Sequence, residues 1–138
     1  MRALLAIILG IVAGLVAQSA VDVLANWLYP ASINNMWDRA QIAAALAARP
    51  TNALLLGAAG YFLGGLVGGG VGKLIWRRAV AAWTPAGVLA AMALAIGFGF
   101  PVPAWAMFAS FVAPLIGGLI ANHLIATAAD PVVVETEE

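Results

Sequence analysis

The stretch that decides the fold reads GAAGYFLGGLVGGGVGK and covers residues 57–73. It is uncharged up to its final lysine, and glycine recurs at every fourth position. In a soluble helix each such glycine costs roughly 0.5–1 kcal/mol relative to Ala. In a membrane, however, small residues at this spacing let two helix backbones approach closely. One row consists of Gly60, Gly64, Gly68 and Gly72, a second of Gly65 and Gly69, and Gly57 and Gly70 lie beside them.

Two other apolar stretches carry small residues at the same spacing and are possible partners for this face. The first has Gly10 and Gly14, and the second has the row Ala109, Ala113, Gly117 and Ala121. We expect the glycine face to pack against one of them within the chain. Two alternatives stay open: the face pairs with a second copy or another membrane protein, or it lines a pore or forms a hinge.

Composition excludes several classes of protein. The chain has 138 residues, of which 64% are hydrophobic and only 9% charged, with six basic and six acidic side chains and no Cys. Soluble domains average about 25% charged residues. So few charges argue against an ordinary soluble domain, a disordered chain and a protein that binds nucleic acid through basic charge. Without cysteine the fold does not depend on disulfides. The composition predicts a membrane protein, with the lipid bilayer as its first partner.

Uncharged runs predict an all-α protein with a bundle of four transmembrane helices. A membrane helix needs about 20 apolar residues to cross a core of roughly 30 Å. The sequence predicts spans at residues 3–25, 52–76, 84–100 and 103–127. They form one domain, 1–129, followed by an acidic tail, 130–138.

Prolines predict where the later spans begin and bend. Pro101-Val102-Pro103 predicts a tight turn, because proline restrains the chain on both sides and donates no backbone hydrogen bond. Thr84 is expected to cap the third span before Pro85, although a start at Ala79 with Pro85 inside the helix is the alternative. Pro114 predicts a kink in the last span, with Ser110 as local partner for the freed carbonyl.

The basic residues predict an orientation in the membrane. With the N-terminus inside, the inner side carries four basic residues and the outer side two, which favours both ends in the cytoplasm. The inner set is Arg2, Lys73, Arg77 and Arg78, and the outer set is Arg39 and Arg49. Ala17-Gln18-Ser19 is similar to a signal-peptide cleavage site, but the apolar run continues past it to Leu28, which favours a retained span.

The outer loop, residues 29–51, predicts one short amphipathic helix at about 36–49. Asn35 is a favoured N-cap residue, and Asp38 three positions later can bond back to the cap. The Arg49-Pro50 pair ends the helix. We interpret it as a helix that lies on the membrane interface or caps the bundle. A lid over a cavity between the helices is the functional alternative.

Polar side chains at membrane depth are candidate functional groups. Gln18, Asp22 and Asn26 recur every four residues and form one stripe. Asp22 is either a proton or cation site, or is held by Asn26, Arg39, Arg49 or the loop helix. His123 is the sole histidine, which excludes a metal site made of several histidines. We expect it to bond a headgroup, a backbone carbonyl or water.

No pattern in the sequence predicts catalysis, a metal or a cofactor. The glycine run ending at Lys73 superficially matches a phosphate-binding loop, but no Ser or Thr follows the lysine and no strand precedes the run. A hydrolytic triad is also missing from the pattern. The sequence therefore predicts that the protein is not an enzyme.

The layout resembles a family of small bacterial four-span membrane proteins of uncharacterised activity. The resemblance is carried by an N-terminal Arg, the acid in the first span, Leu28-Tyr29-Pro30, the glycine-rich second span, and the turn Pro101-Val102-Pro103-Ala104-Trp105. It covers most of residues 1–127 and does not include the acidic tail. It implies the four-span topology and no particular activity or ligand.

Two functions are compatible with this pattern. The sequence favours a structural or accessory membrane protein that packs through its glycine-rich faces with itself or within a larger membrane complex. The alternative is a small transporter, channel or binder of a lipophilic molecule, with Asp22 as its polar site.

Overall fold

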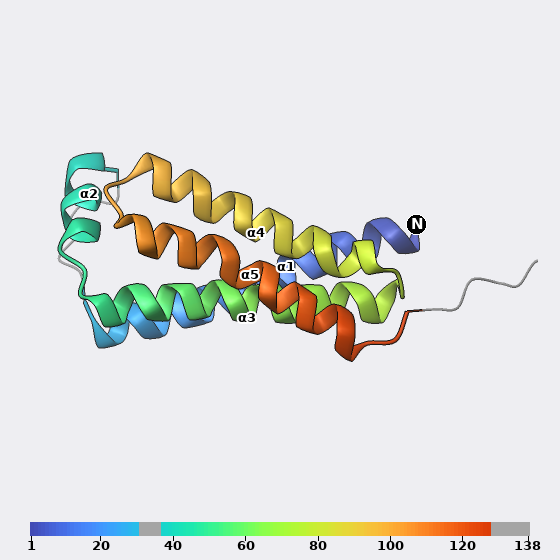
Figure 1. Ribbon diagram of the computed structural model, residues 1–138. Coiled ribbons are helices and arrows are strands. Elements are labelled where there is room, and N and C mark those ends of the chain that lie inside the picture. Colours follow the sequence, from blue (N-terminus) through green and yellow to red (C-terminus); the bar gives the residue numbers. More distant parts are fainter. Residues whose placement is uncertain (31–36, 128–138) are drawn as a thin grey trace, which may run out of the picture.

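The computed structural model describes residues 1–30 and 37–127 and shows a bundle of four long helices. These are α1 (Arg2–Leu28), α3 (Thr51–Ile75), α4 (Ala79–Gly99) and α5 (Ala104–Leu124), and a short helix, α2 (Arg39–Ala47), lies across one end (Figure 1). Each long helix is long and apolar enough to cross a membrane. The predicted all-α fold with four membrane-spanning helices is confirmed, and the protein is a multi-pass membrane protein. The part of the chain that the structure describes contains no strand.

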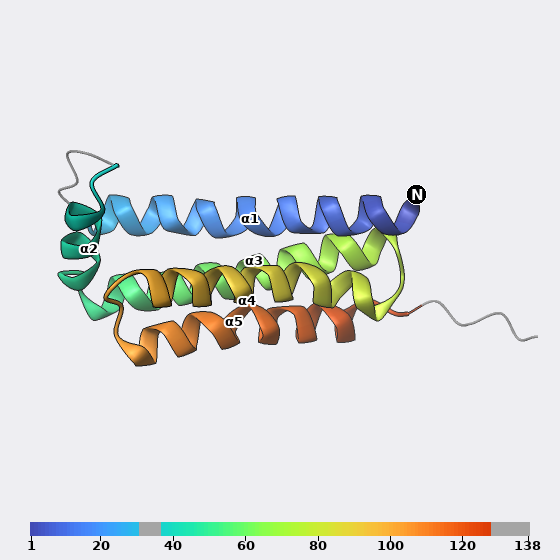
Figure 2. The same ribbon diagram turned by 90° about the horizontal axis from the view of Figure 1, so that it is seen from above.

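Helices α3 and α4 form the middle of the bundle. Each of them contacts the other three long helices, whereas α1 and α5 lie on opposite sides and do not meet within the described residues (Figure 2). We call the end that carries α2 the α2 end, and the end with Arg2 and the α3–α4 turn the basic end.

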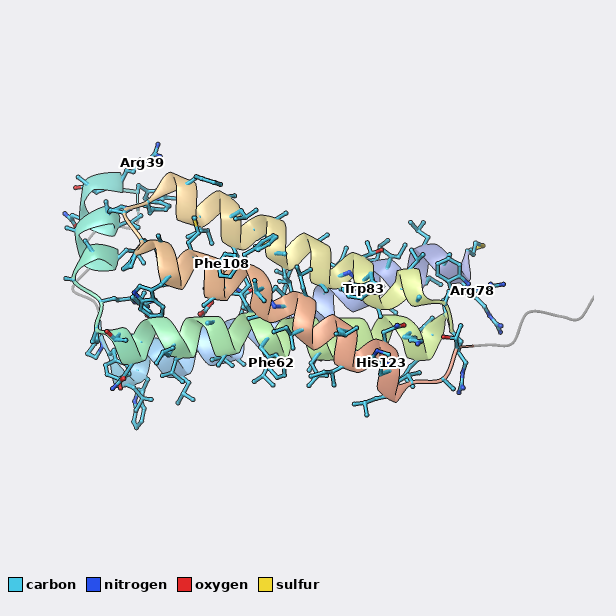
Figure 3. All side chains as sticks on the ribbon, viewed as in Figure 1. Arg39, Phe62, Arg78, Trp83, Phe108 and His123 are labelled. Carbon is cyan, nitrogen blue, oxygen red and sulfur yellow. The ribbon has the colours of Figure 1, made fainter. Side chains whose placement is uncertain are left out.

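Small residues fill the interior, and large apolar side chains cover the outside. The buried core is mostly alanine and glycine, with Tyr61 and Leu89 as its large members. Leu4, Ile8 and Phe108 are exposed on the outer surface, and Figure 3 shows Phe108 pointing away from the bundle. A water-soluble bundle shows the reverse distribution. Lipid tails are as apolar as leucine, so an exposed leucine loses nothing in a bilayer, while small residues allow close helix packing.

The third span begins earlier than the predicted 84–100. Helix α4 starts at Ala79, as the alternative allowed, and Pro85 lies buried inside it. Thr84 is therefore no N-cap: its hydroxyl donates a hydrogen bond of 2.8 Å to the carbonyl oxygen of Val80, one turn earlier. As the seventh residue of α4, Pro85 lies beyond the four free amides of the first turn, so it removes the donor that would bond the carbonyl of Ala81. With 21 residues the helix extends over about 31 Å and can cross a bilayer.

The α2 helix starts at Arg39, three residues later than predicted. Asp38, and not Asn35, caps it: the Asp38 carboxylate accepts hydrogen bonds from the backbone amides of Ala40 (2.9 Å) and Gln41 (3.3 Å). An acidic N-cap is equally favourable and also complements the helix dipole. Asn35 lies outside the described residues, as does the acidic tail, 130–138.

Arg39 fastens α2 to the bundle. Its Nη2 atom donates a hydrogen bond of 3.1 Å to the carbonyl oxygen of Gly99, and its guanidinium group lies 5.7 Å from the centre of the Phe100 ring. Both partners belong to the end of α4. The predicted turn 101–103 follows there, with the amide of Val102 donating to the carbonyl of Phe100 (2.8 Å). The loop helix therefore caps the bundle, as the sequence predicted.

Candidate functional site

The first glycine row packs α3 against α1 in a single antiparallel register. Gly68 faces Gly10 and Gly64 faces Gly14, so each step of four residues along α3 is matched by four residues back along α1. A Cβ atom on Gly10 would lie 2.8 Å from the carbonyl oxygen of Gly68, and one on Gly14 would lie 2.8 Å from that of Gly64. The two backbones are therefore in direct contact. The same register puts Gly60 beside the backbone of Gln18.

The second glycine row packs α3 against α5. A Cβ atom on Gly65 would overlap the backbone of Pro114, and one on Gly69 would meet Ala121 and Gly118. From the other side, Gly117 of α5 fits against the backbone of Phe62. Pro114 thus sits at the point of closest approach between the two helices, where Gly65 makes room for it.

The predicted packing glycines lie against helices of the same chain, with one exception. Gly10, Gly14, Gly60, Gly64, Gly65, Gly68, Gly69, Gly72 and Gly117 are all buried. At Gly57, by contrast, a Cβ atom would meet nothing within 4 Å. Gly57 lines a cavity between the helices.

This cavity lies between the helices near the α2 end, and all five helices contribute to it. It has a volume of about 270 Å³. Its polar lining consists of Gln18, Asp22, Asn26, Arg49, Tyr61 and Ser110. Its apolar wall includes Leu46 of α2, Leu54 of α3, Ile96 of α4 and Ala106 of α5. We call it the polar cavity. The three polar residues predicted as a stripe on the first span all line it.

Gln18 is the deepest polar group of the polar cavity. Its side chain is only 7% exposed, and its Oε1 atom has no hydrogen-bond partner. The Gln18 side chain hydrogen-bonds to Asp22, and because Oε1 is unpaired the donor is the amide nitrogen. The Tyr61 hydroxyl lies beside the same amide. A buried acceptor without a partner is unfavourable, and native structures contain few of them.

Arg49 closes the polar cavity on the side of α2. Its Nη2 atom donates a short hydrogen bond to Oδ1 of Asn26, and its positive charge acts on the half-buried Asp22 carboxyl group. Asp22 thus lies between the amide of Gln18, which donates a hydrogen bond to it, and the guanidinium group of Arg49. Of the partners expected for Asp22, the structure provides Arg49, while Arg39 is engaged with the end of α4.

Two residues of the polar cavity were missed as site residues at the sequence level. Tyr61 lies in the middle of the glycine-rich stretch, and a lone hydroxyl-bearing ring among glycines was the available signal. Ser110 was expected to serve the backbone near Pro114, whereas the structure places it in the cavity lining. Neither residue follows the four-residue spacing that singled out Gln18, Asp22 and Asn26.

His123 belongs to a different part of the molecule. It is exposed in the last turn of α5 at the basic end, opposite the polar cavity (Figure 3). Asp22 and His123 therefore lie at opposite ends of the bundle. Among residues 1–30 and 37–127, no three His, Cys, Asp or Glu side chains come together as metal ligands would.

Lys73 is the second buried polar side chain and was expected only as a charge at a span end. It is 1% exposed, and its Nζ atom donates to the backbone oxygen of Asn122 and, at 2.7 Å, to the Asn122 Oδ1 atom. The Asn122 carbonyl is in the last turn of α5, where no backbone amide of the helix follows to bond it. Lys73 therefore joins the ends of α3 and α5.

Comparison with protein-family models, with curated proteins and with solved structures found no match for this chain. The resemblance to small bacterial four-span proteins stays a prediction.

Proposed function

We propose that this protein binds a small polar solute in the polar cavity and passes it across the membrane. The observation that carries the proposal is Gln18, whose side chain lines the cavity beside Asp22 and whose Oε1 atom is buried and unpaired. An unsatisfied acceptor at this depth is costly. A solute that donates a hydrogen bond removes the cost while it is bound, which makes the site selective for donors.

The size and charge of the polar cavity limit the solute. A volume of about 270 Å³ lies just below the usual range of ligand pockets, which starts at roughly 300 Å³. The guanidinium group of Arg49 partly balances the carboxyl group of Asp22, so the cavity carries little net charge. Its acceptors are the Asp22 carboxylate and, once the buried Gln18 side chain turns toward the solute, the Gln18 Oε1 atom. A small ammonium ion or a neutral amide-bearing solute fits this set.

The orientation expected from the basic residues supports an uptake role. With both ends in the cytoplasm of a bacterial cell, the polar cavity opens near the outer face of the inner membrane. Helix α2 lies across that face, and Leu46 and Arg49 line the cavity. Their position favours the alternative interpretation of the loop helix, which is that α2 forms a lid over the polar cavity.

The accessory role has less support. It relied on glycine-rich faces that associate with a second copy or another membrane protein. Both rows of α3 are covered by α1, α4 and α5 of the same chain. An accessory function would then need another surface.

Transport into proteoliposomes tests the proposal. We expect uptake of radiolabelled methylammonium, which has donors, and little uptake of tetramethylammonium, which has none. Asp22→Asn and Gln18→Leu should each lower methylammonium uptake by about tenfold or more, since a hydrogen bond to a charged group contributes roughly 1.5–3 kcal/mol. Asp38→Asn is the matched control: it removes the same charge outside the polar cavity, and Asn also caps helices.

Two outcomes of the uptake assay would overturn the transport proposal. If wild-type protein takes up neither methylammonium nor urea above empty liposomes, the transport function is wrong. It is also wrong if uptake is unchanged in Asp22→Asn. A stable complex in mild detergent that dissociates on a single surface substitution would favour the accessory role.

A further inference from the structure

The basic end of the bundle carries a second pocket that the proposed function does not use. It has a volume of about 340 Å³ and is lined by Arg2, Leu74, Ile75, Trp76, Arg77 and Arg78. We call it the basic pocket. It lies between the first turn of α1 and the α3–α4 turn, at the end of the molecule where Figure 3 labels Arg78.

The local backbone fixes two of its arginines side by side. Helix α3 ends at Ile75, and Trp76 turns away in an extended conformation. The amide of Arg78 donates a hydrogen bond of 2.6 Å to the carbonyl of Trp76, and Arg78 is the N-cap residue of α4. Arg77 is at the tip of this tight turn. Arg2, in the first turn of α1, contributes the third guanidinium group from a separate helix.

The guanidinium groups of Arg2 and Arg77 have no carboxylate beside them among the described residues. The acidic side chains in residues 1–30 and 37–127 are Asp22 and Asp38. Asp22 lines the polar cavity and Asp38 caps α2, so both lie at the α2 end. Lys73 adds a further positive charge just inside the basic end. The guanidinium groups of Arg2 and Arg77, from two separate segments around one pocket, favour an anionic ligand.

The rest of the lining is apolar and lies where the spans end. Leu74 is 61% exposed and Ile75 is also exposed, both in the last turn of α3. Trp76 follows at the position where amphipathic rings meet the membrane interface. The pocket therefore combines cationic groups on its outer side with an apolar wall that continues into the lipid-facing surface.

We propose that the basic pocket binds the phosphate group of an anionic phospholipid. The planar guanidinium groups of Arg2 and Arg77 donate to the phosphate oxygens, and the acyl chains run along Leu74 and Ile75. Basic pockets at the ends of transmembrane helices bind anionic headgroups in this way. A soluble phosphate compound would use the arginines and leave the apolar wall without a function.

Lipid titration of the full-length protein tests this proposal. The protein is purified in a neutral detergent, phosphatidylglycerol or phosphatidylcholine is added in mixed micelles, and bound lipid is counted by native mass spectrometry. We expect saturable binding of phosphatidylglycerol and none of phosphatidylcholine. Arg77→Gln should weaken binding about fivefold, and Arg2→Gln with Arg77→Gln on the order of 20-fold, because each basic residue near an anionic surface contributes about this factor.

Arg39→Gln is the matched control, because it removes one arginine at the opposite end and should leave binding unchanged. The proposal is overturned if Arg39→Gln weakens binding as much as Arg77→Gln, or if the two lipids bind equally. It is also overturned if glycerol phosphate without acyl chains displaces the lipid at equal concentration, since the ligand is then a soluble anion.

A further experiment tests whether the acidic tail, residues 130–138, fills the basic pocket. Its four carboxylates, Asp130, Glu135, Glu137 and Glu138, are changed together to the corresponding amides in the full-length chain. If the wild type binds no phosphatidylglycerol and this variant does, the tail fills the basic pocket and the lipid proposal is wrong. Equal binding by both supports it.

Discussion

Gly10 and Gly68 meet across the α1–α3 contact with no side chain between the two backbones. A Cβ atom on Gly68 would lie 2.6 Å from the carbonyl oxygen of Gly10, and one on Gly10 would lie 2.8 Å from that of Gly68. This pair sets the distance between the two helices. Two register steps further along, the same contact between α1 and α3 places Gln18 beside Gly60, where Gln18 lines the polar cavity.

Replacing Gly68 by alanine should destabilise the bundle. The new methyl group meets backbone, which cannot rotate away, so α1 and α3 must separate; overpacking of this kind costs about 1–3 kcal/mol. Gly87→Ala is the control, because a Cβ atom at Gly87 in α4 meets nothing within 4 Å and alanine favours the helix. Unfolding in mixed detergent micelles with increasing dodecyl sulfate measures both. Equal stability of Gly68→Ala and wild type would contradict the close contact.

Lys73 and Asn122 should be coupled in stability. Asn122→Ala leaves the backbone carbonyl but removes one partner from a buried ammonium group, which should lower the unfolding free energy by about 1–3 kcal/mol. Lys73→Met keeps the length of the side chain without the charge and should cost less. A double-mutant cycle with both changes should give a coupling of about 1 kcal/mol or more. Strict additivity would show that the two side chains do not interact.

Gln18→Met should separate stability from function. Methionine fills nearly the same volume and removes the unpaired acceptor, which offsets part of the lost hydrogen bond from the Gln18 amide to Asp22, so stability should change by less than about 2 kcal/mol. Methylammonium uptake should be lost, since both the acceptor and the donor to Asp22 are gone. Thermal unfolding in detergent and the proteoliposome assay are run on the same preparation. A variant that is clearly less stable would show that Gln18 has a structural role.

Asp38→Ala should loosen α2 without affecting the bundle. The substitution removes two hydrogen bonds to the first turn of α2, and loss of an N-cap costs typically about 1 kcal/mol. Backbone amides of residues 40–47 should exchange with deuterium about fivefold faster, while those of α3 stay protected. Exchange read by mass spectrometry checks this. Asp38→Asn, which keeps a capping side chain, should behave like the wild type.

The order and type of the helices could be predicted from the sequence. Uncharged runs of sufficient length and the prolines at 101 and 103 located four helices, since the bilayer imposes a minimum length and requires every backbone group to be bonded within the helix. Helix starts were less predictable. Thr84-Pro85 and Asn35 both carry capping signals, but α4 begins at Ala79 without a side-chain cap, and α2 begins after Asp38, which is a second capping residue close to Asn35.

The candidate site could be predicted only in part. The four-residue spacing identified Gln18, Asp22 and Asn26, because residues at this spacing share one face of a helix. The same rule could not find Tyr61, Ser110 or Arg49, which come from other segments and meet the stripe only after folding. The sequence also did not predict the burial of Lys73, because a lysine at the end of a span is typically an exposed charge at the membrane interface.

By itself the sequence determined that this is a membrane protein of four helices with two rows of glycine on its second span. Tertiary structure alone decided that one row faces α1 and the other α5, that Gly10 opposes Gly68, and that a polar cavity remains near the α2 end. The physical reason is that lipid and protein interior are both apolar. Hydropathy therefore fixes which segments enter the membrane, whereas the direction in which each helix face points depends on the close packing of small residues.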